Sequence, residues 1–248
     1  MAGWPLPFWI AHRGAGKLAP ENTLAAFRLG ASHGYKAFEC DVKLSADGVP
    51  FLLHDDTLDR TTSAKGPAGS RPWAELSRLD AGSWHSAAYA GEPPASLEAL
   101  AAFCVANGYA LDLEIKPSPG TETDTGRAVG ELVRKLWRGA APLLSSFKTQ
   151  ALAGARETAA ELPRALLLDT LWPGCIEMSA SLDCVAIITN HKLMNADLLR
   201  QIHGAGRRAL VYTVNDAARA NELIALGIDG IVTDAVDRLG PGDPVRAR

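Results

Sequence analysis

The chain has 248 residues, of which 47% are hydrophobic and 21% are charged, and its formal net charge at pH 7 is −3. This composition excludes a disordered chain, a collagen-like repeat and a small disulfide scaffold, and it is typical of a globular protein with a large core. Because no run of Lys or Arg is longer than a pair, we expect neither a nucleic-acid partner nor stable membrane association.

The N-terminal apolar stretch and the cysteines carry information about the compartment. Residues 4–10 are too few to span a bilayer and lack a basic leader, so we interpret them as a first strand rather than a signal peptide. The four cysteines are scattered, with no CxxC pair. We therefore expect reduced, mostly buried thiols and a cytoplasmic protein. The sequence carries no signal for an oligomeric state.

Short apolar segments alternate with helical patterns along the chain. Strands are predicted at residues 8–11, 37–44, 110–115, 142–147, 164–168, 184–189, 209–214 and 230–232. Helices are predicted at residues 22–32, 97–107, 125–137, 150–160, 196–203 and 217–226. Four of these helices are followed by a glycine at 34, 108, 206 or 227, which is typical of a left-handed helix C-cap.

This alternation predicts the fold class. Strands that alternate with helices form right-handed parallel crossovers, and eight such units in 248 residues are the size of a closed (β/α)8 barrel, or TIM barrel. We expect residues 1–248 to form one such catalytic domain. The alternative is an open doubly wound sheet, which is disfavoured because no GxGxxG or GxxxxGK[ST] loop follows the first strand.

One long segment interrupts the alternation. Residues 45–48 predict a hairpin turn and residues 49–53 a short returning strand. Residues 55–94 then show weak periodicity, four prolines and the aromatics Trp73, Trp84 and Tyr89. We interpret residues 55–94 as a small inserted cap or lid, with a one- or two-turn helix near residues 73–79. A disordered loop is the alternative, although its aromatic side chains would need a surface to pack on.

Acidic residues occupy strand positions where a parallel barrel normally buries Val, Ile or Leu. Glu39 and Asp41 are two residues apart and so share one face, as do Asp112 and Glu114 on the next predicted strand. Converging carboxylates in a desolvated site need a cation, and an all-oxygen ligand set suits Mg²⁺, Ca²⁺ or Mn²⁺. The alternative places Glu39 and Asp41 on an outward face, paired with Lys36, Lys43 or helix residues.

Two histidines lie close to these acids. His12 follows the first strand, and the hairpin brings His54 roughly opposite Glu39. Two imidazoles that flank a cation can act as general acid and base in the hydrolysis of a phosphate ester, and Arg13 and Lys116 add positive charge for a phosphoryl group. We favour His54 as the acid, because a place beside Glu39 would raise its pKa.

With these residues the sequence resembles the glycerophosphodiester phosphodiesterase family. The resemblance covers residues 10–234 in several ordered motifs. They are His12-Arg13-Gly14, Pro20-Glu21-Asn22-Thr23, Glu39-x-Asp41-Val42, Asp47-Gly48, His54-Asp55, Arg60-Thr61-Thr62, Leu113-Glu114-Ile115-Lys116, Ser146-Phe147, Tyr212-Thr213-Val214-Asn215 and Gly230-Ile231-Val232-Thr233-Asp234.

The resemblance implies a TIM barrel with an inserted cap, and hydrolysis of glycerophosphodiesters to sn-glycerol 3-phosphate and an alcohol. It implies a divalent metal at Glu39, Asp41 and Glu114, with general acid and base at His12 and His54.

The same resemblance implies the substrate contacts. Arg13 matches a phosphate-contacting arginine and Lys116 a lysine near the substrate. The family often has Trp where this chain has Tyr212, which predicts weaker contact with the glycerol backbone or a shifted substrate preference.

Two other functions stay open. A phospholipase-type lipid phosphodiesterase would need an exposed apolar or basic patch, for which Trp73 and Trp84 are the candidates. A non-catalytic phosphate-binding barrel would have no use for an acid and a base, so loss of either histidine would leave its ligand affinity near normal.

Overall fold

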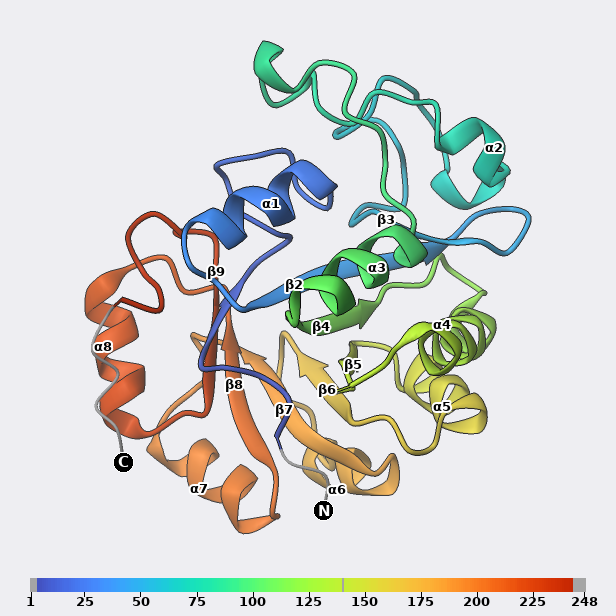
Figure 1. The fold of residues 1–248 in the computed structure, drawn as a ribbon. Helices are drawn as coiled ribbons and strands as arrows, with labels where there is room; N and C mark the ends of the chain where they lie inside the picture. Colours follow the sequence, from blue (N-terminus) through green and yellow to red (C-terminus); the bar gives the residue numbers. More distant parts are fainter. Residues whose placement is uncertain (1–3, 140, 243–248) are drawn as a thin grey trace.

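The computed structural model describes residues 4–139 and 141–242, and within these ranges eight parallel strands close into a barrel (Figure 1). They are β1 (Trp9–Ala11), β2 (Ala37–Leu44), β4 (Ala110–Ile115), β5 (Leu143–Ser146), β6 (Arg164–Leu168), β7 (Cys184–Asn190), β8 (Arg208–Tyr212) and β9 (Gly230–Thr233). The barrel closes because β1 pairs with β9 on one side and with β2 on the other. This closure confirms the predicted (β/α)8 barrel, and the open-sheet alternative is wrong.

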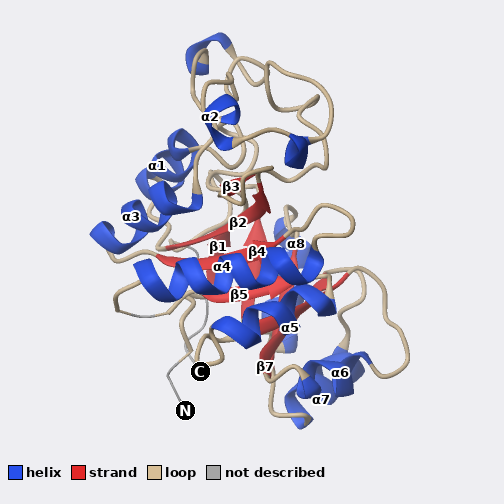
Figure 2. Ribbon diagram, turned by 90° about the vertical axis from the view of Figure 1, so that its right-hand side faces the viewer, coloured by secondary structure: helices blue, strands red, loops and turns tan. Residues whose placement is uncertain are grey.

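Helices surround the barrel (Figures 1 and 2). They are α1 (Leu24–Ser32), α3 (Leu97–Asn107), α4 (Glu122–Leu136), α5 (Thr149–Thr158), α6 (Cys175–Ser181), α7 (Ala196–Gly204) and α8 (Ala217–Leu226). Each predicted helix is present, although α4 begins at Glu122 rather than at residue 125. Helix α6 was not predicted, because its seven residues are too few to show a helical period.

Alternation along β2 separates the barrel interior from the layer that faces the helices. Ala37 packs in the interior cluster, whereas Phe38 and Val42 pack in the larger cluster beneath the helices. Glu39 and Asp41 are buried and share the face of Ala37. The alternative that put these two carboxylates on an outward face is therefore wrong.

The cap segment, residues 55–94, follows β3 (Pro50–Leu52) and lies beyond one side of the barrel (Figure 2). It contains the 3₁₀ turns η1 (Ala68–Ser70) and η2 (Ala87–Tyr89) and the helix α2 (Trp73–Leu76). A separate small cluster buries three side chains of the segment, Leu58, Ala68 and Leu76, against Phe51 and Leu53. The predicted hairpin and short helix are confirmed, and the small cluster supplies the packing that a disordered loop would lack.

The register of the hairpin differs from the predicted one. Val42 lies opposite Leu52, whereas Glu39 opposite His54 would require Val42 opposite Phe51. The turn itself sets this register, because the Ser45 N–H donates to the carbonyl of Val49 over 3.0 Å and makes the loop one residue longer than the four-residue turn predicted. The pairing of Glu39 with His54 is therefore wrong by one residue.

All four cysteines, Cys40, Cys104, Cys175 and Cys184, are free and buried, as predicted. Burial raises the pKa of Cys104 and of Cys184 to about 12, so these thiols stay protonated and unreactive. Among the described residues, no helix combines the length and the apolar composition needed to cross a membrane.

Candidate active site

A cavity of about 200 Å³ opens at the carboxyl ends of the barrel strands, the end at which (β/α)8 barrels carry chemistry. Most of the predicted site residues line it. They are His12, Arg13, Glu39, His54, Glu114, Lys116 and Tyr212. Asp41 lies against them with only 1% of its surface exposed. The structure thus brings all the predicted site residues together.

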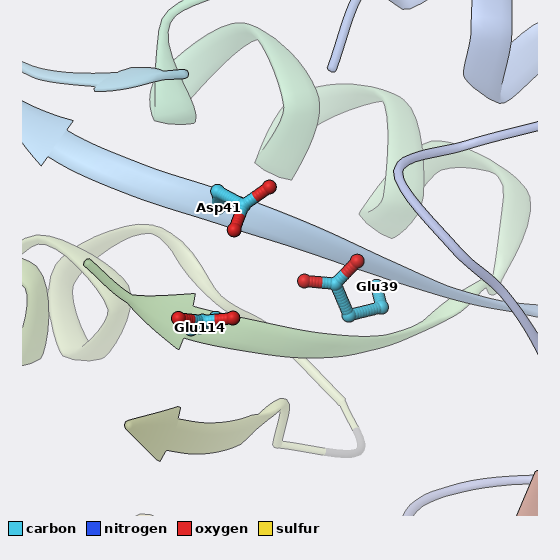
Figure 3. A group of neighbouring side chains, drawn as sticks. All are labelled: Glu39, Asp41 and Glu114. Atoms are coloured by element: carbon cyan, nitrogen blue, oxygen red, sulfur yellow. The ribbon is translucent and has the colours of Figure 1, made fainter. Parts of the chain in front are cut away.

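Three carboxylates converge at one side of the cavity. Figure 3 shows Glu39 and Asp41 on β2 and Glu114 on the neighbouring β4. Each side chain offers one oxygen within 4.8 Å of the others, and all three side chains are buried. Their convergence follows from the parallel register, which sets Asp41 directly beside Glu114.

The electrostatics of this triad favour a bound cation. Burial raises the pKa of Glu39 and that of Glu114, the latter to about 7, and the Asp41 carboxylate raises both further. Burial also acts on Asp41, but Arg13 and Lys116 outweigh it and lower its pKa below the usual range. The buried Oδ1 of Asp41 accepts no hydrogen bond, although Lys116 Nζ lies 3.2 Å away. This oxygen-only set fits a hard divalent cation.

The loop after β1 holds the triad in place. Asn22 donates from Nδ2 to Asp41 Oδ2 over 2.8 Å and accepts the Asp41 N–H at Oδ1. The Arg13 N–H donates to Glu39 Oε2 over 3.1 Å, and Arg13 Nε lies 3.2 Å from Asp41 Oδ2. Asn22 adopts a left-handed backbone with φ of 60°, and Thr23 caps α1. Asn22 was predicted to begin that helix and instead binds a carboxylate.

His12 is held by the strand that closes the barrel. Its Nδ1 lies 2.6 Å from Asp234 Oδ1, and its Nε2 lies 3.7 Å from Glu39 Oε2. Asn215 Nδ2 donates to the other oxygen of Asp234 over 2.9 Å. Burial favours the neutral form of Asp234, but its hydrogen bonds with His12 and Asn215 prevail and lower its pKa. Sequence reasoning indicated Asp234 only as part of the resemblance, and it indicated Asn215 as a polar residue near a strand end and as an N-cap candidate.

His54 is held by a chain of ion pairs. Its Nδ1 lies 2.7 Å from Asp55 Oδ1, and Arg60 donates to both oxygens of Asp55 over 2.8 and 2.9 Å. Arg60 also donates to both oxygens of Glu21, which in turn accepts from Arg13 over 2.8 Å. This chain connects the cap segment with the loop after β1. In the sequence, only the family resemblance indicated these ion pairs, and it assigned no role to Glu21 or Arg60.

The pKa of His54 is lowered rather than raised. Burial is the largest cause, and the positive charges of Arg13 and Lys116 lower the pKa further, although Asp41 opposes them. The prediction that Glu39 raises this pKa is wrong, because burial and these two cations outweigh the carboxylates near the ring. The reason for preferring His54 as the acid is thereby removed.

Phe147 and Tyr212 form an aromatic wall of the cavity, next to Lys116. Lys116 Nζ lies 3.1 Å from Glu114 Oε1 and 5.7 Å from the centroid of the Phe147 ring. The Phe147 and Tyr212 rings meet edge to face, with centroids 5.8 Å apart. Lys116 and Tyr212, both predicted to contact substrate, are therefore connected through Phe147.

Comparisons with known proteins show similarity over nearly the whole chain. A phosphodiesterase of Oleispira antarctica, solved in complex with its product sn-glycerol-3-phosphate, is 36% identical and superposes with a TM-score of 0.90 over 94% of this chain and 95% of that one. The Bacillus subtilis protein YhdW is 33% identical over 234 residues, which are 92% of this chain and 94% of that protein. A glycerophosphodiester phosphodiesterase of Caldanaerobacter subterraneus is 29% identical over 93% of this chain and 95% of its own length.

The model of the glycerophosphoryl diester phosphodiesterase family matches residues 12–238. That span begins at the first predicted catalytic histidine and ends beyond Asp234, so it contains every side chain described above. The chain belongs to the glycerophosphoryl diester phosphodiesterase family.

Proposed function

We propose that this protein is an enzyme that hydrolyses glycerophosphodiesters to sn-glycerol 3-phosphate and an alcohol. The observation that carries the proposal is that two imidazoles, each fixed by a carboxylate, face one cavity beside a buried carboxylate triad. The product-bound Oleispira phosphodiesterase, which is similar over nearly the whole chain, supports the substrate class.

Glu39, Asp41 and Glu114 would hold a divalent cation, Mg²⁺, Ca²⁺ or Mn²⁺. When bound, such an ion supplies charge that stabilises the phosphoryl oxygens as the ester bond breaks. The chain's own contribution is to keep the three carboxylates together despite their mutual repulsion, Asp41 and Glu39 through Asn22 and Arg13 and Glu114 through Lys116.

His12 and His54 would move the protons. In each ring Nδ1 is occupied by an aspartate, so Nε2 is the nitrogen left for proton transfer. One imidazole takes a proton from the attacking water as its oxygen bonds to phosphorus, and the other gives a proton to the departing alkoxide as the ester bond breaks. The aspartates fix the ring orientations and stabilise each imidazolium as it forms.

Arg13 and Lys116 would contact the phosphate. Both are largely buried, and their carboxylate neighbours outweigh the effect of burial and raise their pKa values. They therefore stay cationic over the working pH range and complement the negative charge of a phosphodiester. Tyr212 would pack on the substrate from the aromatic wall.

We also propose that the cap segment, residues 55–94, acts as a lid. It carries Asp55 and Arg60, which orient His54, and it contacts the loop after β1 through the hydrogen bond between His85 Nε2 and the Lys17 carbonyl. A segment in this position can exclude water from the reacting centre.

The phospholipase-type alternative rests on the two tryptophans of the cap segment. Trp73 packs on Phe51, with ring centroids 5.9 Å apart, and only Trp84 is well exposed, at 40%. The two tryptophans of the cap segment therefore do not form the exposed apolar patch that this alternative needs.

The test is the release of sn-glycerol 3-phosphate from a panel of glycerophosphodiesters, with and without a chelator. We expect release from at least one ester, loss of release on chelation and recovery with added divalent cation. A purified, folded protein that binds glycerol 3-phosphate but hydrolyses no ester would instead be a phosphate-binding barrel.

A further inference from the structure

The side of the cavity away from the triad carries one more charged group. Asp169 follows β6 directly and lines the same cavity as Phe147 and Tyr212. Its Oδ1 accepts a hydrogen bond from Asn190 Nδ2 over 3.0 Å. It also lies 3.3 Å from the Tyr212 hydroxyl, which shares its one proton between Asp169 and the Leu168 carbonyl at 3.2 Å. Three neighbouring strands, β6, β7 and β8, thus fix the position of this carboxylate.

The negative charge of Asp169 is not compensated by the protein. The other carboxylates that line the cavity have partners in the protein: Glu39 accepts the Arg13 N–H and Glu114 contacts Lys116, while the buried Asp112 accepts the hydroxyl of Ser145. Among residues 4–139 and 141–242, no Lys, Arg or His forms an ion pair with Asp169. The Asp169 side chain is also exposed, so a ligand can reach it.

The cavity therefore has one end where Arg13, Lys116 and a cation at the triad would bind a phosphate, and another end that carries the carboxylate of Asp169. Lys116 lies over the Phe147 ring, Phe147 meets Tyr212 edge to face, and the Tyr212 hydroxyl donates to Asp169. Burial, together with the Asp169 carboxylate, raises the pKa of Tyr212, so the phenol stays a protonated donor. A ligand that fits both ends is a zwitterion with a phosphate at one side and a cation at the other.

We propose that Asp169, with the aromatic wall formed by Phe147 and Tyr212, binds a small alkylammonium group in the alcohol half of the substrate, which places Tyr212 beside the alcohol and not beside the glycerol backbone that the resemblance implies. This inference rests on the proposed function and narrows it: esters of choline or ethanolamine are preferred over esters of neutral alcohols. Such a cation gains from the carboxylate and from the adjacent π-systems, whereas a neutral alcohol gains at most a hydrogen bond.

The test compares kcat/KM for glycerophosphocholine and glycerophosphoethanolamine with kcat/KM for glycerophosphoglycerol, in the wild type and in Asp169→Asn. Asn keeps the shape and can still accept from Asn190, but it removes the charge. We expect the preference for the cationic esters over the neutral ester to fall about three- to tenfold in Asp169→Asn, mainly through KM. Asp169→Glu, which restores the charge, should recover part of the preference.

The matched control is Asp183→Asn. Asp183 contacts Arg156 on the exposed surface, before β7 begins, and its left-handed backbone with φ of 53° also suits Asn. This variant makes the same charge change without touching the cavity, so the preference should stay at its wild-type value.

Three outcomes would overturn the inference. A wild type with no preference for cationic esters does so directly, and so does an Asp169→Asn variant that keeps the preference. An equal loss on all three esters places Asp169 beside the glycerol half that they share. If the wild type hydrolyses none of the three esters or any other glycerophosphodiester, the proposed function itself fails, which is a different result.

Discussion

His12 and His54 each contact an aspartate through Nδ1, yet different kinds of structure hold the two rings. The partner of His12 is Asp234, placed at the barrel rim by the last strand and fixed by Asn215. The partner of His54 is its neighbour in the chain, Asp55, which depends on Arg60 of the cap segment. The Arg60 side chain is 43% exposed. Strand register therefore positions the His12 ring, whereas partly solvated ion pairs position the His54 ring.

This difference separates what the barrel supplies from what the inserted segment supplies. Strand register is set by many backbone hydrogen bonds and by a buried core, so it resists salt and single surface mutations. Exposed ion pairs each contribute little and are screened by salt. We therefore expect changes around His12 to be costly under all conditions and changes around His54 to be smaller and dependent on ionic strength.

The largest effect should come from the triad that both histidines flank. Removing the divalent cation with a chelator should abolish turnover, and Mg²⁺, Mn²⁺ or Ca²⁺ should restore it, because the carboxylates repel one another and the substrate phosphate without it. Glu39→Ala should weaken metal binding, measured by calorimetry, in a protein that still folds. Glu98→Gln, an exposed control on α3, should bind metal normally. Full activity after exhaustive chelation would remove the metal from the mechanism.

Replacing either histidine should come next in size. His12→Ala and His54→Ala should each lower kcat by about 10²- to 10⁴-fold with metal affinity nearly intact. On a nitrophenyl phosphodiester, whose leaving group needs no proton, one variant should regain most of its rate, and that histidine is the general acid. If neither variant slows hydrolysis of a natural ester more than about threefold, the carboxylates must transfer the protons.

A direct comparison of the two aspartates should give a smaller effect and an unequal one. Asp234→Asn should lower kcat by about 10- to 100-fold, since the amide neither stabilises an imidazolium nor fixes the same tautomer. Asp55→Asn should cost less, about three- to tenfold, because Arg60 already offsets much of the Asp55 charge. The measurement is kcat of both variants on the same ester at steady state. Equal losses of kcat in Asp234→Asn and Asp55→Asn would show that strand register does not make the Asp234 contact more important than the Asp55 contact.

The same contrast explains how much could be predicted from the sequence. Repeated strand–helix units predicted the barrel, and side-chain alternation placed Glu39 and Asp41 inside it, because both follow from local periodicity. The partner of His12 lies 222 residues away in the chain, which no local pattern reveals. The one-residue error at His54 arose because its position depends on the length of a single hairpin loop, and α6 was too short to leave a pattern.

The triad also predicts how pH affects the stability of the metal-free protein. Burial raises the pKa of Glu114 from 4.5 to about 7, so the folded state prefers the protonated form. Stability from this group is present below the unfolded pKa and is lost as pH rises towards 7. The Tm of chelated protein should fall by several degrees between pH 5 and 7.5, since about 1 kcal/mol corresponds to about 2–4 °C for a chain of this size.

Glu114→Gln removes this titration, so the fall in Tm should shrink in the variant. The lowered pKa values of Asp41 and Asp234 act at more acidic pH. Burial also raises the pKa of Glu39 and that of Asp112, the latter to about 7, so these two carboxyls should account for the part of the fall that Glu114→Gln leaves. A variant with the same pH dependence as the chelated wild type would show that Glu114 is not the group that titrates.

The smallest effect should come from Arg60, and it tests the contrast most directly. Arg60→Gln leaves Asp55 in contact with His54 but removes the pairs with Glu21 that tie the cap segment to the loop after β1. We expect kcat/KM to fall about two- to fivefold at low salt. Because 1 M salt screens these pairs in the wild type as well, the gap between the two proteins should close at high ionic strength. The control is Arg78→Gln, in the cap segment without an ion pair to the site; its kcat/KM should follow the wild type at both salt concentrations. A deficit in Arg60→Gln that persists unchanged in 1 M salt would mean that packing, rather than charge, holds His54.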